Sequence, residues 1–423
     1  GTDNKWASAA GGQYHSVAVK ADGTLWAWGR SNYGQLGIFG SLTTKTTPTQ
    51  LGTDTTWVAA AAGANHTVVV KADGTLWAWG YNASGQLGIS SAETYTTARM
   101  QVGSDNTWVS AAAGYSHTLA VKSDGTLWAW GDNSSGQLGL TTSITSTNMP
   151  AQIGTDTNWQ AVAAGRYHSV AVKSDGTLWT WGSNGYGQLG DGTMTNRSSL
   201  FSVDTLAGSW RTLAAGGNFA GALQANGTLW TWGQNVSGAL GDRTVRTRFM
   251  PGKVGIGNTW ASASAGRAHT VAVKADGTLW AWGDNASGQL GDNTIVSKST
   301  PMQISTGTTW VSAVTGSSHG LAIKSDGTLW TWGNNLSGQL GLGDTAQRNS
   351  PTSVVSSTPW VDVAAGDQHS VAIKSGGTLW AWGNNIFGQL GIASSVTSTA
   401  APTQIGTDSK WISVAAGYAH TLA

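Results

Sequence analysis

The sequence predicts an all-β protein built from tandem repeats, and three observations support this prediction. All 25 tryptophans fall into two repeating sets, a single Trp and a Trp-x-Trp pair, in a unit about fifty residues long. Each unit contains two short β-like segments joined by a tight-turn sequence. No window keeps a helical apolar period for two turns. Together these observations favour a β-propeller of eight blades, with seven blades as the alternative.

The tryptophan spacing defines the repeat. Sixteen tryptophans form eight Trp-x-Trp pairs, from Trp26/Trp28 to Trp380/Trp382. The other nine recur every 50 or 51 residues, at Trp6, Trp57, Trp108, Trp159, Trp210, Trp260, Trp310, Trp360 and Trp411. A fixed period of this length is typical of propellers and solenoids. No tryptophan is left over to form a separate ligand platform.

One unit illustrates the expected strands. His66 to Lys71 alternates β-branched and small residues, and Thr75 to Trp79 forms a second strand-like segment. Asp73-Gly74 between them is a tight-turn signal. The glycines that follow mark sharp turns or close approaches of the backbone; they are Gly80, Gly85 and Gly88.

The second strand indicates how the sheets pack. Leu76 and Ala78 lie on one face, and Trp77 and Trp79 lie on the other. A sheet with one solvated face would alternate apolar and polar residues. Two apolar faces predict sheets sandwiched between neighbours, as in a propeller, which also protects strand edges. A β-solenoid is the main alternative, but its coils are usually shorter and lack hairpins.

The repeat resembles the RCC1 family. The matching motifs are G-x-x-H at Gly63 to His66, D-G-x-x-x-x-W-G at Asp73 to Gly80, and N-x-x-G-Q-L-G at Asn82 to Gly88. They recur in phase through essentially all 423 residues. Kelch repeats carry a double glycine that is absent here, and WD repeats are shorter. The resemblance implies a propeller, usually of seven blades.

Counting hairpins predicts eight blades instead. Eight G-T-L-W-x-W-G hairpins are present, and residues 406–423 repeat residues 1–18 almost residue for residue. We therefore expect residues 1–423 to form a single repeat domain, with eight units of 50–51 residues and a partial ninth at 406–423. The end at Ala423, midway through an expected strand, leaves open a chain cut from a longer array.

Composition excludes several functions. Charged residues make up only 10% of the chain, and the formal net charge is +1, so no global field attracts nucleic acid. No apolar run reaches the roughly 18–20 residues of a membrane span. The absence of cysteine excludes disulfides, thiolate metal sites and a cysteine nucleophile. We expect neither a nucleic-acid partner nor a membrane span.

Polar residues in repeat positions are expected to be structural. All eight histidines share one position, where Phe219 replaces them once, and the Asp of Asp-Gly is replaced by Asn226 and Gly376. We expect each imidazole to bond a neighbouring backbone group and hold adjacent blades together. No interval between the recurring tryptophans exceeds 51 residues, so no inserted loop is available for catalysis. We expect no cofactor, no metal and no enzymatic activity.

Departures from the repeat suggest a binding surface in the fourth and fifth units. Ala239 replaces the Gln of G-Q-L-G, and the densest basic run of the chain follows it. Arginine beside an exposed aromatic side chain is typical of interface hot spots. The candidate partner-binding residues are Phe201, Arg243, Arg246, Arg248, Phe249 and Lys253. The alternative is neutral drift in a solvated loop.

These observations predict a non-enzymatic scaffold for protein–protein interaction with an unknown protein partner. The regular, cysteine-free repeats resemble a branch of secreted bacterial family members, which implies an extracellular or cell-surface location. The best-known eukaryotic member is a nucleotide exchange factor, but nothing here matches the inserted element on which that activity depends. A carbohydrate-binding propeller and a purely structural module of a larger surface protein remain alternatives.

Overall fold

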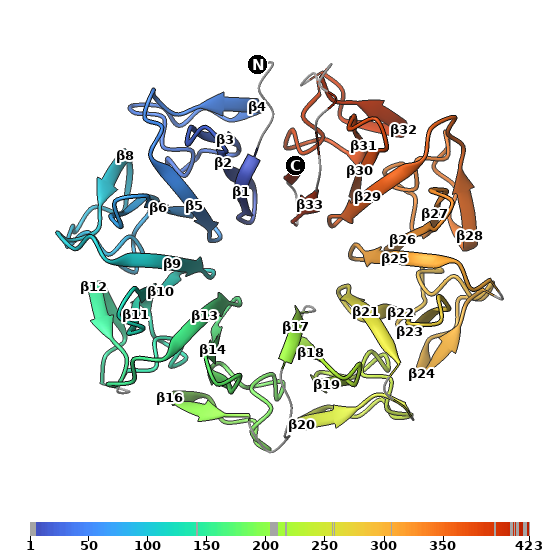
Figure 1. The fold of residues 1–423 in the computed structure, drawn as a ribbon, viewed down its shortest axis with the longest axis horizontal. Coiled ribbons are helices and arrows are strands. Elements are labelled where there is room, and N and C mark those ends of the chain that lie inside the picture. The colour runs from blue at the N-terminus through green and yellow to red at the C-terminus, as the bar shows by residue number, and fades with distance from the viewer. Residues whose placement is uncertain are drawn as a thin grey trace.

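The chain forms a ring of β-sheets around a central opening (Figure 1). The computed structural model describes residues 6–140, 143–203, 210–215, 218–255, 257, 259–305, 307–392, 395–406, 409, 411, 414–417 and 421–422. Within these residues the regular structure is β-strand, without a helix, arranged as eight four-stranded sheets and one two-stranded sheet. The all-β propeller and its eight blades are therefore confirmed, and seven blades is not the arrangement found.

The first four blades follow the chain order of the repeats. Blade 1 contains β1 (Trp6–Gly11), β2 (His15–Lys20), β3 (Leu25–Gly29) and β4 (Lys45–Gln50). Blade 2 contains β5 (Trp57–Ala62), β6 (His66–Lys71), β7 (Leu76–Tyr81) and β8 (Tyr95–Gln101). Blade 3 contains β9 (Trp108–Ala113), β10 (His117–Lys122), β11 (Leu127–Asp132) and β12 (Ser146–Gln152). Blade 4 contains β13 (Trp159–Ala164), β14 (His168–Lys173), β15 (Leu178–Gly182) and β16 (Arg197–Ser202).

The second four blades repeat the pattern. Blade 5 contains β17 (Trp210–Ala215), β18 (Phe219–Gln224), β19 (Leu229–Gly233) and β20 (Arg248–Lys253). Blade 6 contains β21 (Trp260–Ala265), β22 (His269–Lys274), β23 (Leu279–Gly283) and β24 (Lys298–Gln303). Blade 7 contains β25 (Trp310–Thr315), β26 (His319–Lys324), β27 (Leu329–Gly333) and β28 (Arg348–Val354). Blade 8 contains β29 (Trp360–Ala365), β30 (His369–Lys374), β31 (Leu379–Asn384) and β32 (Ser398–Gln404).

Each four-stranded blade is an antiparallel meander whose second and third strands meet at a tight turn, which is Asp-Gly except in blade 5 (Asn226-Gly227) and blade 8 (Gly376-Gly377). In blade 2, Gly74 has a φ of 79°, a left-handed conformation that glycine adopts without a steric penalty. The Asp73 carboxylate accepts hydrogen bonds from the backbone N–H and the hydroxyl of Thr75, at 2.9 and 2.7 Å. The turn role predicted for the repeated Asp is confirmed.

The partial ninth unit forms its own strand pair at the closure of the ring. Strands β33 (Ala415–Ala416) and β34 (Thr421–Leu422) contact blade 8 on one side and blade 1 on the other. The backbone N–H of Val414 donates to Asp362 at 2.8 Å, and the hydroxyl of Ser16 donates to the Thr421 carbonyl at 3.3 Å. Both copies of the repeated strand pair, β1–β2 and β33–β34, therefore lie in the ring. The single domain over residues 1–423 stays a prediction.

The second tryptophan of each pair packs between blades. Trp79 is fully buried and donates its indole N–H to the Gln35 carbonyl of blade 1 at 3.0 Å. The ring lies against Gly37, where a Cβ would come within 2.7 Å of the indole nitrogen. The same bond from one blade to the previous one is made by Trp130, Trp181, Trp232, Trp282, Trp332 and Trp382. The last glycine of G-Q-L-G is therefore required, because a side chain there would collide with the indole ring.

The first tryptophan of each pair is only partly buried, which corrects the expectation that neighbouring sheets cover both apolar faces of this strand. Trp77 packs edge-on against Trp57, with ring centroids 6.0 Å apart. The ammonium group of Lys71 lies 4.6 Å from the centroids of both rings. We call Trp57, Trp77 and the lysine over them a tryptophan cage. Trp77 stays partly exposed because the flexible lysine side chain, and not a neighbouring blade, lies over its ring.

Several of the repeated histidines link neighbouring blades, as predicted, but they bond a side chain rather than the backbone. His66 is buried, and its Nε2 lies 3.1 Å from the Thr118 hydroxyl of the next blade. The expected partner was a backbone group, so that detail was wrong. Burial lowers the pKa of His66 to about 3, which keeps the imidazole neutral. Hydroxyl partners are also found for His15, His117 and His319.

Candidate functional site

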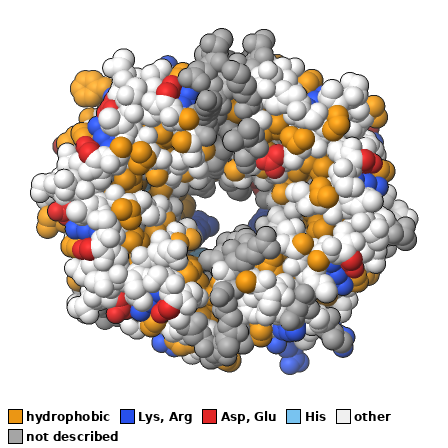
Figure 2. Space-filling model, viewed as in Figure 1, with side chains coloured by type: hydrophobic (Ala, Val, Ile, Leu, Met, Phe, Trp, Pro, Cys, Tyr) orange, Lys and Arg blue, Asp and Glu red, His pale blue; other side chains and the backbone are white. Residues whose placement is uncertain are grey.

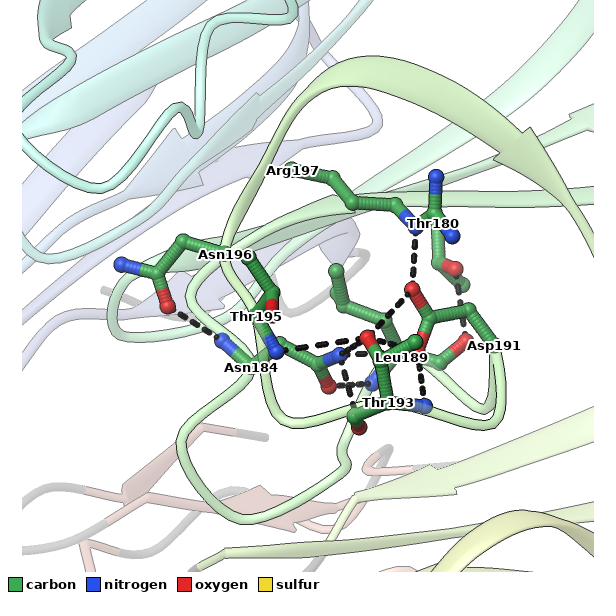
Figure 3. Close-up of polar contacts among 8 residues, drawn as sticks. All are labelled: Thr180, Asn184, Leu189, Asp191, Thr193, Thr195, Asn196 and Arg197. Atoms are coloured by element: carbon green, nitrogen blue, oxygen red, sulfur yellow. Dashed lines mark hydrogen bonds and ion pairs between the residues drawn. The ribbon is translucent and has the colours of Figure 1, made fainter.

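The candidate site begins with the outer loop that joins the third and fourth strands of a blade. Figure 3 shows this loop in blade 4, where Asp191 lies at its centre. Its carboxylate accepts hydrogen bonds from Asn184 and Thr193 at 2.8 and 2.9 Å and pairs with Arg197. Burial alone would raise the pKa of Asp191, but these hydrogen bonds lower it below the usual value. The loop is therefore held around a buried, ionised carboxylate.

Blade 5 builds its outer loop in the same way. Asp242 accepts hydrogen bonds from Asn235 at 3.1 Å and from the backbone N–H of Thr244 at 3.0 Å. Arg248, at the start of β20, pairs with Asp242 at 3.3 Å. These contacts fix the course of the chain from residue 242 to residue 248. The basic residues predicted from the sequence are consequently displayed on an ordered loop.

The structure brings together only part of the predicted residue set. Arg243, Arg248 and Lys253 line one cleft of about 560 Å³ between blade 5 and blade 6. Arg246 is exposed on the same loop but does not line the cleft. Figure 2 shows Lys and Arg side chains gathered on the rim at the bottom of the view, where β20 lies in Figure 1.

The two predicted aromatic residues are less accessible than the sequence suggested. Phe249 is partly buried and packs near Gly187 of blade 4, where an added Cβ would come within 2.6 Å of the phenyl ring. Phe201 is partly buried beneath Arg197, whose guanidinium lies 4.7 Å from the ring centroid. Neither one is the exposed aromatic that was expected beside the arginines.

The floor of the cleft comes from blade 6 and was missed in the sequence. Lys274 lies over the tryptophan cage of that blade, 5.2 Å from the Trp260 centroid and 3.8 Å from the Trp280 centroid. Trp260 and Trp280 stand at regular repeat positions, so the sequence does not mark them as part of a cleft. The sequence does hold one signal for this site, the lysine that ends the second strand of most units. In blade 6 this residue is Lys274, at the end of β22. The cations that line this cleft favour an anionic group as its ligand.

A second surface lies on the face that carries the G-x-x-H loops. Tyr115 and Tyr167 of adjacent blades have ring centroids 5.6 Å apart, and the Arg166 guanidinium lies 5.0 and 5.3 Å from them. Tyr14 of blade 1 meets Phe387 of blade 8 at 5.2 Å. These aromatics occupy variable positions of the repeat, so they do not stand out in the sequence as departures of one unit from the others.

Other site chemistries are not represented in the described residues. Within these ranges, no group of three or more His, Cys, Asp or Glu side chains could hold a metal ion. No helix in the described part of the chain is long and apolar enough to cross a membrane.

Comparison with known proteins matches a family profile over both halves of the chain and individual relatives over little more than half of it. The sequence profile described as RCC1-like domain matches residues 1–210 and 202–423. The chain is 32% identical over 249 residues to the ultraviolet-B receptor UVR8 of Arabidopsis thaliana, covering 57% of this chain and 56% of the receptor. It is 31% identical over 245 residues to the human E3 ubiquitin-protein ligase HERC2, covering 56% of this chain and 5% of the ligase. The matches therefore span little more than half of the receptor and a small part of the ligase.

Solved structures agree on the fold. Human WBSCR16 superimposes with a TM-score of 0.60 at 24% identity, covering 83% of this chain and all of that chain. Prp20p of Saccharomyces cerevisiae superimposes with a TM-score of 0.58 at 23% identity, covering 82% of this chain and 91% of that chain. With a family profile that spans both halves of the sequence, the chain belongs to the RCC1-like family.

Proposed function

We propose that this propeller is a non-enzymatic scaffold that binds a protein partner through the outer edge of blade 5. The single observation that supports the proposal is the ordered basic loop between Asp242 and Arg248. Arg243 and Arg246 project from it in a chain with only 22 lysines and arginines. Prp20p is described by its binding to Gsp1p and histones, and it has also been captured with Kap60, so binding of proteins has precedent among RCC1-like propellers.

We further infer an extracellular or cell-surface location. Its support is the resemblance of the regular, cysteine-free repeats to secreted family members. Antibody labelling of intact and permeabilised source cells tests this location. Labelling of intact cells supports it, whereas labelling only after permeabilisation contradicts it.

The interaction itself is tested with paired variants. The double substitution Arg246→Ala, Phe249→Ala alters the basic loop, whereas Val296→Ala, Ser299→Ala makes a matched change at the corresponding positions of blade 6. Proteins crosslinked to the purified wild-type chain are identified by mass spectrometry, and the binding of each is then measured with purified components. We expect the first variant to lose the partner and the second to keep it. The first variant should melt lower than wild type because Phe249 is partly buried, so Arg246→Ala alone, at an exposed residue, is the variant expected to melt close to wild type. Equal binding by both variants would move the contact to another surface, first of all the tyrosine-bearing face.

A further inference from the structure

The tryptophan cages of blades 2, 3 and 4 carry their own anion. In blade 2, Lys71 lies over Trp57 and Trp77 and forms an ion pair with Asp54 at 2.6 Å. Asp54 comes from the connection between blades, three residues before Trp57. The next two blades repeat the pair at 2.7 and 2.8 Å, as Lys122–Asp105 and Lys173–Asp156.

Blade 6 keeps the cage but not the carboxylate. Lys274 lies over Trp260 and Trp280, whose rings meet edge to face at 6.1 Å. Three residues before Trp260 stands Gly257, and a Cβ built there would have no atom within 4 Å. None of the ion pairs among the described residues includes Lys274. The position from which blades 2, 3 and 4 supply a carboxylate is open to solvent here.

Blade 5 adds a cation to the same cleft at the edge of its sheet. Lys253 lies opposite Trp230 in the strand register. In the other seven blades the residue opposite the corresponding tryptophan is neutral: Gln50, Gln101, Gln152, Ser202, Gln303, Ser353 and Gln404. Lys253 is therefore a departure from the repeat that adds positive charge to the cleft.

Arg243 adds a second cation, in a backbone conformation that favours glycine. Its φ is 71°, and its backbone N–H donates to the Ser299 carbonyl of blade 6 at 2.7 Å. The residues that make the corresponding bond in other blades are neutral; they are Ser90, Gly192, Asn293 and Gly343. A left-handed conformation is strained for an arginine, so this charge is placed at the cleft at some expense of stability.

These three departures converge on one site. The described lining of the cleft includes four cations, Arg243, Arg248, Lys253 and Lys274, and one carboxylate, Asp242, which already pairs with Arg248. We propose that the cleft between blades 5 and 6 binds a carboxylate side chain from an acidic segment of a protein partner. The carboxylate takes the place on Lys274 that the protein's own aspartates take on the lysines of blades 2, 3 and 4. This inference rests on the proposed scaffold function and specifies the chemistry of its partner.

The repeat itself favours a carboxylate over a larger anion. The equivalent lysines hold aspartate oxygens at 2.6–2.8 Å, a geometry that Lys274 offers to an incoming Asp or Glu. The faces of Trp260 and Trp280 suit the methylene groups of such a side chain. The cleft therefore offers one site for a carboxylate on Lys274 and further cations beside it, which favours a peptide that carries several acidic residues.

The test uses a fluorescently labelled hexaglutamate peptide and measures its binding to the full chain by fluorescence anisotropy. The variants restore residues that the repeat already uses, so folding is expected to be retained. Lys274→Gln matches Gln224 of blade 5, and the double change Arg243→Asn, Lys253→Gln matches Asn293 and Gln303 of blade 6. Lys71→Gln, in a cage that has its own aspartate, is the matched control. Thermal melting confirms that each variant is folded.

We expect wild type and Lys71→Gln to bind hexaglutamate equally, with an affinity that falls as salt rises. Lys274→Gln and the double variant should each weaken binding by about tenfold to a hundredfold, the range for loss of a charged hydrogen bond. The inference is overturned if hexaglutamine binds as well as hexaglutamate, or if Lys71→Gln weakens binding as much as Lys274→Gln. It is also overturned if inorganic phosphate or a uronic-acid disaccharide competes as strongly as hexaglutamate.

The two proposals can fail separately. Recovery of a protein partner by Lys274→Gln as well as by wild type, with no hexaglutamate binding, would remove the carboxylate site and leave the scaffold function. Specific hexaglutamate binding without any protein partner would support the carboxylate site and contradict the scaffold function.

Discussion

Blades 2 and 3 differ from blades 5 and 6 in which member of an ion pair is buried. In blade 3 the buried member is Lys122, whose side chain is 10% exposed, while Asp105 is 54% exposed. In blade 6 the buried member is Asp292, 2% exposed, while Lys298 is 25% exposed. The two pairs occupy different places in the repeat. The pair in blade 3 joins the end of the second strand to the interblade connection and leaves a carboxylate outward, whereas the pair in blade 6 lies in the outer loop and leaves a lysine outward.

This difference shows how a regular repeat acquires a directional surface without inserted loops. The interblade contacts are alike on both sides: Trp130 bonds the Gln86 carbonyl at 2.9 Å, and Trp282 bonds the Ala239 carbonyl at 2.8 Å. Because that bond uses a backbone carbonyl, replacement of Gln by Ala239 does not remove it. The core is therefore common to all blades, and the edges are free to differ.

The largest expected effect tests whether the core is common to both regions. Trp130→Ala in blade 3 and Trp282→Ala in blade 6 should each lower the free energy of unfolding by about 3–5 kcal/mol, because each removes a fully buried ring. Trp128→Ala should cost less than half of that, because its ring is partly exposed. Urea unfolding of the three variants checks the order. A much smaller loss for Trp282→Ala than for Trp130→Ala would mean that the two regions differ in their cores.

The next effect tests the reversal of the buried charge. Asp292→Ala in blade 6 should cost about 2–3 kcal/mol, because it removes a buried carboxylate that accepts several hydrogen bonds and leaves Lys298 and Asn285 without it. Asp105→Ala should cost less than about 1 kcal/mol, because Asp105 is mostly exposed. Urea unfolding at neutral pH measures both. Equal losses would show that the burial of the carboxylate does not govern the stability of the outer loop.

Much of the fold follows from the sequence, and the reason lies in the repeat. Asp73-Gly74 specifies its turn locally, and the tryptophan period specifies the number of blades, so both could be predicted. The role of Trp77 could not, because it depends on Lys71 lying over the ring from the adjacent strand. The cleft was half predicted: Arg243, Arg248 and Lys253 stand out in the sequence, whereas Lys274 is an ordinary repeat residue. Its setting differs from that in blades 2, 3 and 4 because Gly257, seventeen residues earlier in the chain, stands where those blades have an aspartate.

A smaller effect compares the histidine units with the one that has phenylalanine. His117→Phe should fold and cost about 1 kcal/mol at pH 7.5, because it removes one hydrogen bond to Ser169 in a position where Phe219 is already accommodated. Burial lowers the pKa of His117 from 6.5 to about 3, so the unfolded state binds the proton more readily between these values. Stability contributed by the neutral imidazole is present above pH 6.5 and is lost as the pH falls.

The pH dependence separates this histidine from a merely packed side chain. Below pH 6.5, each unit of pH should cost wild type about 1.4 kcal/mol more than His117→Phe, which has no group to titrate there. The advantage of wild type should therefore vanish near pH 6 and reverse below it. Urea unfolding of both proteins at several pH values tests this, and a constant difference across that window would mean that folding does not lower the pKa of His117.

The smallest expected effect on stability concerns the basic edge itself. Arg246 is exposed on the blade 5 loop, and Val296 occupies the corresponding place in blade 6. Arg246→Val makes blade 5 match blade 6 at this position and should change the free energy of unfolding by no more than about 0.5 kcal/mol, as expected for a surface substitution. Its effect on association should be visible in the rate instead, because an exposed charge at the rim accelerates encounter with an oppositely charged partner. Stopped-flow binding of hexaglutamate at low and high salt measures that rate. If Arg246→Val associates more slowly than wild type at low salt but equally fast at high salt, the exposed positive charge on this side of the ring acts in solution. If the two rates are equal at both salt concentrations, the electrostatic difference between the two sides is confined to the residues that line the cleft.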